Sequence, residues 1–132
     1  MNKLPLIAAA VLLSACQHPT PAPKASLDGE VFYLQRIALP PTAVLSVSLQ
    51  DISLADAPAK VIDEQRGPVK GQVPLPFRLN YDPLKVEPNH RYSINARIEV
   101  DGKLLFITTE NHAVRLDGSD PQPVRVRVDA AR

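Results

Sequence analysis

Residues 91–109, RYSINARIEVDGKLLFITT, decide the fold of this chain. Apolar side chains occupy every second position from Tyr92 to Val100, and polar side chains fill the positions between them. This period of two predicts a β-strand with one buried face. The pair Asp101-Gly102 follows, and such a pair is typical of a two-residue turn that joins two antiparallel strands.

The turn also predicts how the two strands of this hairpin are paired. If two residues form the turn, Ile98 faces Leu105 and Ala96 faces Ile107 across the hairpin. Apolar residues of both strands then lie on one face, as a half-buried sheet requires.

Further strands are predicted along the rest of the chain. They are expected at residues 30–37, 45–49, 60–65, 73–79 and 124–128. Prolines at one side of the 73–79 segment predict an edge strand or an irregular one, because proline cannot donate to a β-ladder. Together these segments predict an all-β fold, a single antiparallel β-sandwich of about seven short strands.

Composition and charge exclude several classes of protein. The chain has 132 residues, with 15 Lys and Arg against 14 Asp and Glu, so there is no basic excess of the kind that nucleic-acid binders show. Fourteen prolines argue against long helices. The single cysteine excludes an intramolecular disulfide. We therefore expect one domain, a monomer, and no nucleic-acid partner.

The N-terminus has the features of an export signal. Lys3 provides a positive charge, and residues 4–13 form an apolar run of ten residues, too short for a membrane-spanning helix. The sequence Leu13-Ser14-Ala15-Cys16 then resembles the lipobox of bacterial lipoproteins, in which the cysteine thiol takes a diacylglyceryl group before cleavage.

This resemblance implies three parts of the chain. Residues 1–15 form the signal peptide, residues 16–26 form a lipidated, proline-rich and flexible linker, and residues 27–132 form the β-sandwich domain. The acyl chains, palmitate among them, would anchor the protein. By the lipoprotein sorting rule, Gln17 in place of Asp implies the outer membrane, with the domain on its periplasmic face.

Four stretches of the domain resemble a known family. They are IALPP at residues 37–41, VSLQDISLADAP at 47–58, PFRLNYDP at 76–83 and residues 91–109. In their order and spacing, behind a lipobox, they resemble the YbaY/YscW lipoproteins. The resemblance implies a periplasmic β-sandwich. One branch of the family contains pilotins that help to deliver or assemble the secretin of type III secretion. The other branch, which this sequence resembles more, consists of housekeeping lipoproteins.

The sequence offers little that points to catalysis or to a metal. No G-x-S-x-G motif is present, and Cys16 is assigned to the lipid. His90 and His112 lie near Glu87 and Glu110, but their spacing matches no metal-ligand signature, so they are interpreted as turn residues. We expect no catalytic residue, no metal and no cofactor.

One pair of side chains leaves two interpretations open. The expected hairpin register turns Leu104 and Phe106 away from the buried face, opposite Glu99 and Arg97. These apolar residues are either covered by another part of the fold or exposed as a partner-binding patch, with Arg97 and Glu99 as its polar rim.

The function predicted from the sequence is a non-catalytic binding or assembly module on the outer membrane. Its partners would be the membrane, through the lipid on Cys16, and an envelope protein. Two alternatives stay open, a dedicated pilotin or chaperone for a type III secretion secretin, and a small envelope enzyme acting on glycan or lipid.

The lipid anchor can be tested directly. We expect Cys16→Ser to leave the precursor uncleaved or unanchored, because the thioether is the only predicted attachment to the membrane. Radiolabelled palmitate should enter the wild-type chain and not the variant. Incorporation of label into Cys16→Ser, or its absence from the wild type, would contradict the assignment.

Overall fold

The computed structural model describes residues 24–132 of the chain. The predicted signal peptide and the lipobox with Cys16 lie outside the described residues. The described part contains nine strands and one short 3-10 turn: β1 (Ala25–Phe32), β2 (Ala43–Asp51), β3 (Lys60–Pro68), β4 (Leu75–Tyr81), η1 (Pro83–Lys85), β5 (Tyr92–Val100), β6 (Lys103–Ile107), β7 (His112–Val114), β8 (Val124–Arg127) and β9 (Asp129–Ala130). Within residues 24–132 there is no helix with the length and apolar character needed to cross a bilayer.

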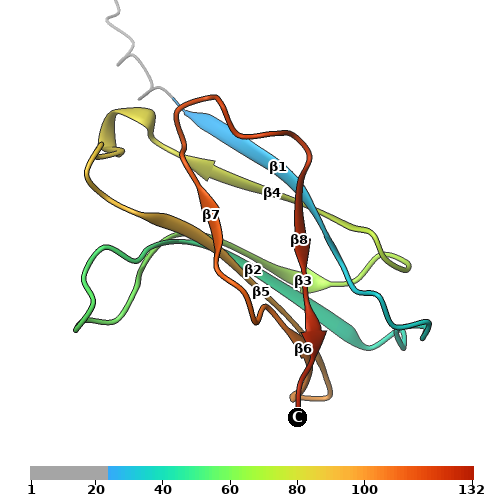
Figure 1. Cartoon of the computed structure of the whole chain (residues 1–132). Coiled ribbons are helices and arrows are strands. Elements are labelled where there is room, and N and C mark those ends of the chain that lie inside the picture. Colours follow the sequence, from blue (N-terminus) through green and yellow to red (C-terminus); the bar gives the residue numbers. More distant parts are fainter. Residues whose placement is uncertain (1–23) are drawn as a thin grey trace, which may run out of the picture.

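The strands form two sheets that face one another (Figure 1). The smaller sheet has the order β4-β1-β8, and the larger has the order β3-β2-β5-β6-β9, with β7 paired to β5. The predicted β-sandwich is therefore confirmed. It has more strands than expected, because β7 and β9 are too short to produce a visible alternation in the sequence.

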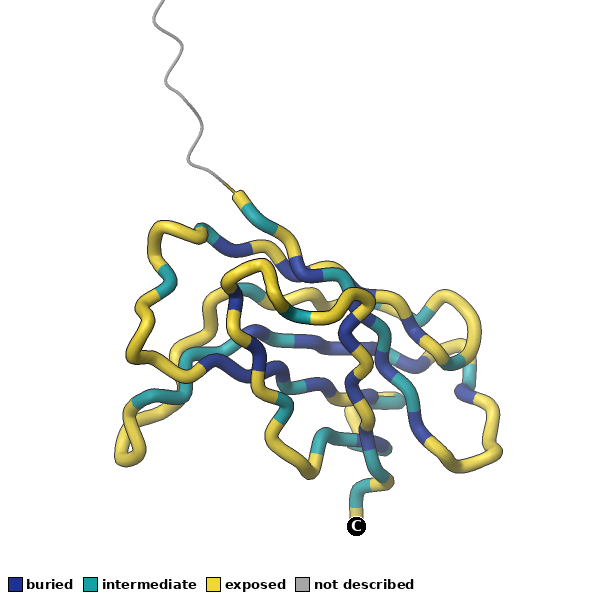
Figure 2. The backbone as a smooth tube through the Cα atoms, turned by 45° about the horizontal axis from the view of Figure 1, so that its top comes forward, coloured by how far each residue is buried: buried dark blue, intermediate teal, exposed yellow. Residues whose placement is uncertain are grey.

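The core lies between the sheets and follows the alternation of the sequence. Figure 2 shows buried residues alternating mainly with intermediate ones along the central strands, and buried residues alternating with exposed ones along β4 and β8. The largest fully buried side chains come from both sheets, and they are Leu27, Val31, Leu49, Leu79, Ile94, Ile98 and Phe106, with the valines at 47, 124, 126 and 128. Burying one face of each sheet in this way is the main favourable contribution to folding.

One pairing differs from the antiparallel arrangement that the sequence predicts. Strand β8 runs parallel to β1, with Gly29 opposite Val124 and Phe32 opposite Arg127. The alternation of Val124 and Val126 with arginines predicts a strand with one buried face, and that is observed. Alternation carries no information about the direction of the neighbouring strand, which is why the parallel pair was missed.

The strand predicted at residues 30–37 also lies elsewhere. Strand β1 ends at Phe32, and Leu34 and Ile37 beyond it are exposed. The strand instead begins at Ala25, inside the segment predicted as linker.

The edge of the smaller sheet is closed by side chains from the larger one. Strand β4 is an edge strand, as its prolines predict. On its free side Arg78 N donates to Gln65 Oε1 at 2.8 Å, and Asn80 N donates to Asp63 Oδ2 at 2.6 Å. Pro76, two residues earlier, shares this side of the strand and has no N–H. The edge therefore offers no free donor at these three positions to another chain.

The hairpin that decides the fold contains a β-bulge. Val100 pairs with Lys103 and Glu99 with Leu104, but Ile98 then pairs with Phe106 instead of Leu105. One residue of β6 is therefore unpaired, and the side chains beyond it change face relative to the predicted register.

Close packing between β1 and its two neighbours is visible at Gly29. A Cβ atom built on Gly29 would lie 2.3 Å from Phe77 Cζ and 2.6 Å from the carbonyl oxygen of Val124. The ring and the backbone of the parallel strand occupy the space that a side chain would need. A glycine at the centre of this sheet is thus required by packing.

We expect Gly29→Ala to lower the free energy of unfolding by about 1–3 kcal/mol, because overpacking displaces the Phe77 ring or strand β8. Gly67→Ala is the matched control, since no atom lies within 4 Å of its added Cβ. Urea denaturation of both variants measures the effect. Equal stability of the two variants would contradict this account of the packing.

Candidate partner-binding site

The partner-binding patch predicted on the hairpin is not formed. Phe106 is 2% exposed and stacks on Tyr33, with ring centroids 4.2 Å apart and planes 3° from parallel. The expectation that Phe106 could lie on the surface is therefore wrong, because the bulge turns its side chain into the core. Leu104 lies opposite Glu99, as predicted, and is partly buried.

Arg97 and Glu99 lie on the outer face of the larger sheet. Arg97 Nε is 3.0 Å from Glu99 Oε1, and Arg66 Nη2 approaches the same carboxylate at 3.6 Å. These side chains form a local charge cluster rather than the rim of an apolar patch around Phe106. The remaining predicted site residues, Leu13, Ser14, Ala15 and Cys16, lie outside the described residues.

An open groove of about 800 Å³ lies at one end of the sandwich. It is bounded by the start of β1, the end of β4, the loop from η1 to β5, and strand β7. Its lining is largely apolar and includes Ala25, Ile52, Tyr81, Val86, Tyr92, Ala113, Val114 and Leu116. Such a surface suits the apolar side chains of a bound peptide segment.

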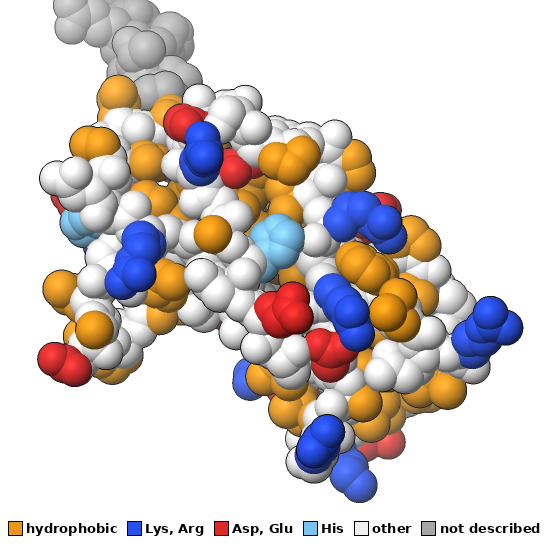
Figure 3. Space-filling model, viewed as in Figure 1, with side chains coloured by type: hydrophobic (Ala, Val, Ile, Leu, Met, Phe, Trp, Pro, Cys, Tyr) orange, Lys and Arg blue, Asp and Glu red, His pale blue; other side chains and the backbone are white. Residues whose placement is uncertain are grey.

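Charged groups of both signs surround this apolar lining. Glu87, Arg91, Arg115 and Asp117 belong to the groove, together with His90. Figure 3 shows acidic and basic side chains interspersed over this face of the molecule, without a patch of one sign. The groove therefore favours an apolar segment with a mixed polar border over a highly charged ligand.

A second hollow of about 260 Å³ adjoins the first. Val86, Glu87, His90 and Tyr92 line both. The segment from residue 86 to residue 92 is thus the wall between them, and the shape of the groove depends on how this wall is held.

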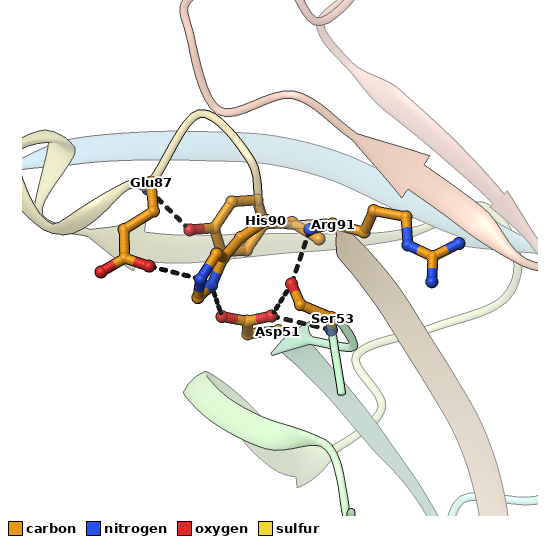
Figure 4. A network of polar contacts seen from close by, with 6 residues as sticks. Asp51, Ser53, Glu87, His90 and Arg91 are labelled. Atoms are coloured by element: carbon orange, nitrogen blue, oxygen red, sulfur yellow. Dashed lines mark hydrogen bonds and ion pairs between the residues drawn. The ribbon is translucent and has the colours of Figure 1, made fainter. Parts of the chain in front are cut away.

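A network centred on His90 holds the wall to the end of β2 (Figure 4). His90 Nδ1 lies 2.5 Å from Asp51 Oδ2, and Nε2 is paired with the carboxylate of Glu87. Ser53 Oγ donates to Asp51 Oδ1 at 2.5 Å and accepts from Arg91 N at 2.8 Å. One histidine thereby joins three segments of the chain.

The same wall is held at its base by Tyr92. Its hydroxyl accepts a hydrogen bond from Glu87 N at 2.9 Å, while its ring is buried against the core. The opposite side of the groove is fixed by Asp120, whose two carboxylate oxygens accept from Arg115 N and Leu116 N at 2.8 Å each.

The two partners of the His90 network have shifted pKa values. Desolvation opposes ionisation of Asp51, but hydrogen bonds from Ser53 and His90 outweigh it and lower the pKa of Asp51 to about 2. The hydrogen bond to Asp51 raises the pKa of His90 above its ordinary value, and the charge of Glu87 adds to this. The protonated form of His90 is thus favoured, and in that form the network is an imidazolium between two carboxylates.

His112 is not part of this network. It is partly buried on β7, and desolvation lowers its pKa. His90 and His112 therefore lie on different segments and do not form a common site. Among the described residues, no group of three His, Cys, Asp or Glu side chains is arranged to hold a metal ion.

Comparison with known proteins decides the family. A model of the YscW family, described as the type III secretion system lipoprotein chaperone, matches residues 22–128. The chain belongs to the YscW family. The resemblance predicted from the sequence is thus confirmed.

Two relatives extend this finding. The uncharacterised lipoprotein YbaY of Escherichia coli (strain K12) is 44% identical over 105 residues, which cover 79% of this chain and 55% of YbaY. The chain thus spans about half the length of that relative. A solved structure of an alternative pilotin from the type II secretion system of Vibrio cholerae matches with a TM-score of 0.76 and 49% identity, over 83% of this chain and 99% of that one.

The His90 network predicts a pH-dependent contribution to stability. Because the folded-state pKa of His90 is raised, its contribution is fully present below the unfolded pKa and is lost as pH rises through the folded value. The difference in melting temperature between wild type and His90→Gln should be largest near pH 6 and should shrink towards pH 9. A difference that does not change with pH would contradict the ion pairs.

Proposed function

We propose that this protein is a lipid-anchored pilotin-like module that binds a segment of an envelope secretin in the groove beside His90. The single observation that supports the proposal most strongly is the similarity to the V. cholerae pilotin. That similarity covers 83% of this chain and 99% of the pilotin chain, at 49% identity.

The proposal also includes the location of the protein in the cell envelope. A lipid on Cys16 would hold the domain at the outer membrane, on its periplasmic face, as the lipobox and Gln17 predict. The YscW family and the E. coli relative are described as lipoproteins, which supports an envelope location. If the protein is a monomer, each lipid-anchored copy would bind one secretin segment in its groove.

The groove has the chemistry that such a role requires. Its apolar lining can bury aliphatic or aromatic side chains of a bound segment, which is where most binding energy in peptide recognition arises. The two carboxylates in its lining already have partners, since Glu87 pairs with His90 and Asp117 accepts from Ser119. This favours binding over the hydrolytic activity of an envelope enzyme.

A charge placed in the groove tests the proposal. Ala113 is exposed on β7 and lines the groove, so Ala113→Arg should place a guanidinium where apolar side chains would dock. We expect capture of the periplasmic region of a secretin from the same genome to fall by at least about tenfold, because a desolvated charge opposes docking.

Ala130→Arg is the matched control, since Ala130 is also exposed but lies on β9 and does not line the groove. It should capture the secretin as the wild type does, and both variants should keep the wild-type melting temperature. Undiminished capture by Ala113→Arg would remove the groove as the docking site. No capture by the wild type would overturn the pilotin assignment.

A further inference from the structure

The described chain begins at the same end of the molecule as the groove and the most exposed leucine. Ala25, the first residue of β1, pairs with Tyr81, the last residue of β4. Two residues later the η1 turn begins, and its central residue Leu84 is 79% exposed. In Figure 1 the start of β1, the η1 turn and the loop after β2 all lie at this end.

Exposed apolar side chains gather at this end. Six large apolar residues are exposed in the described part of the chain. Four of them belong to this end: Leu84 on η1, Leu54 on the loop after β2, and Val61 and Ile62 at the start of β3. A single exposed leucine is ordinary, but a concentration of them on adjoining loops marks a contact surface.

The η1 turn is built to hold Leu84 outward. Asp82 Oδ1 accepts a hydrogen bond from Leu84 N at 2.9 Å, and Lys85 N donates to Asp82 O at 3.0 Å. None of the turn's three residues is buried. Lys85 follows Leu84 and Lys24 precedes β1, so two cations accompany the apolar tip, together with the carboxylate of Asp82 that caps the turn.

The length of chain before β1 limits how far this end of the domain can lie from the bilayer. Only eight residues, 17–24, separate Cys16 from Ala25. Even fully extended they span no more than about 30 Å. A lipid on Cys16 would therefore keep the start of β1 within about 30 Å of the bilayer, while the loop that follows β1 is at the far end of the domain.

We infer that the end of the domain formed by the η1 turn and the loop after β2 rests on the bilayer, with Leu84 in the interface and Lys85 towards anionic headgroups. This inference rests on the proposed lipid anchor. The acyl chains are the first attachment to the membrane, and leucines and lysines on loops add a second, weaker one. Two attachments together fix the orientation of an anchored domain as well as its distance from the bilayer. The groove would then open beside the membrane surface.

The chain contains no tryptophan, which allows a direct test. Leu84→Trp places a single reporter on the η1 turn. Leu34→Trp is the matched control, because Leu34 is 63% exposed but follows β1 at the opposite end of the domain. Both variants replace an exposed leucine, so neither disturbs the core.

The lipidated full chain with each substitution is reconstituted into vesicles of phosphatidylethanolamine and phosphatidylglycerol that contain brominated phospholipid. We expect the emission of Leu84→Trp to shift to shorter wavelength and to be quenched several-fold more strongly than that of Leu34→Trp, since tryptophan favours the interface.

The outcomes separate this inference from the proposed function. If both variants float with the vesicles but neither is quenched, or both are quenched equally, the inferred orientation is overturned while the anchor stands. If the wild-type chain does not float with the vesicles, the lipid anchor fails and the orientation fails with it.

Discussion

The pairing of β1 with two neighbours at once is the constraint on which the rest of the structure depends. Strand β1 is the central strand of the smaller, three-stranded sheet, where it runs antiparallel to β4 and parallel to β8. Gly29 at its middle leaves room for the ring of Phe77, and Leu27 and Val31 on either side supply the buried face. Without this strand, β4 and β8 would have no partner in their sheet, and the inner face of the larger sheet would lose the surface that covers it.

The free edge of the smaller sheet is capped by side chains of the larger sheet. Asp63 and Gln65 on β3 use their side chains to accept from the backbone of β4, so an edge of one sheet is capped by a strand of the other. Pro76, on the same side of β4, has no backbone N–H that needs an acceptor. This arrangement holds the two layers in register and also prevents β4 from adding a strand of another molecule. Tyr33 and Phe106 make a second connection between the layers through their stacked rings.

Much of the fold was predictable because it follows from local alternation. The faces of β2, β5 and β8 and the turn at Asp101-Gly102 are set by neighbouring residues, and the structure agrees with them. The bulge in β6 was not predictable in this way. The turn fixes only the nearest pairs, and whether Leu105 or Phe106 faces the core depends on what the opposite sheet offers, here the ring of Tyr33.

The site was harder to predict than the fold, because its contacts join distant parts of the chain. Asp51 and His90 are 39 residues apart, and each looks like an ordinary turn residue in the sequence. The signal that could have found them is the strand pairing itself. Once β2 is placed antiparallel to β5, Asp51 lies opposite Tyr92, two residues from His90.

The division between core and loops separates the contacts that stabilise the fold from those that shape the groove. Polar contacts hold the walls of the groove: η1 buries none of its residues, and the walls are held by Asp82, Asp120 and the His90 network. These polar contacts set the shape of the groove, whereas the free energy of folding comes mainly from the apolar faces of the sheets. Changes in the loops can therefore alter the shape of the groove while the sandwich that carries them stays intact.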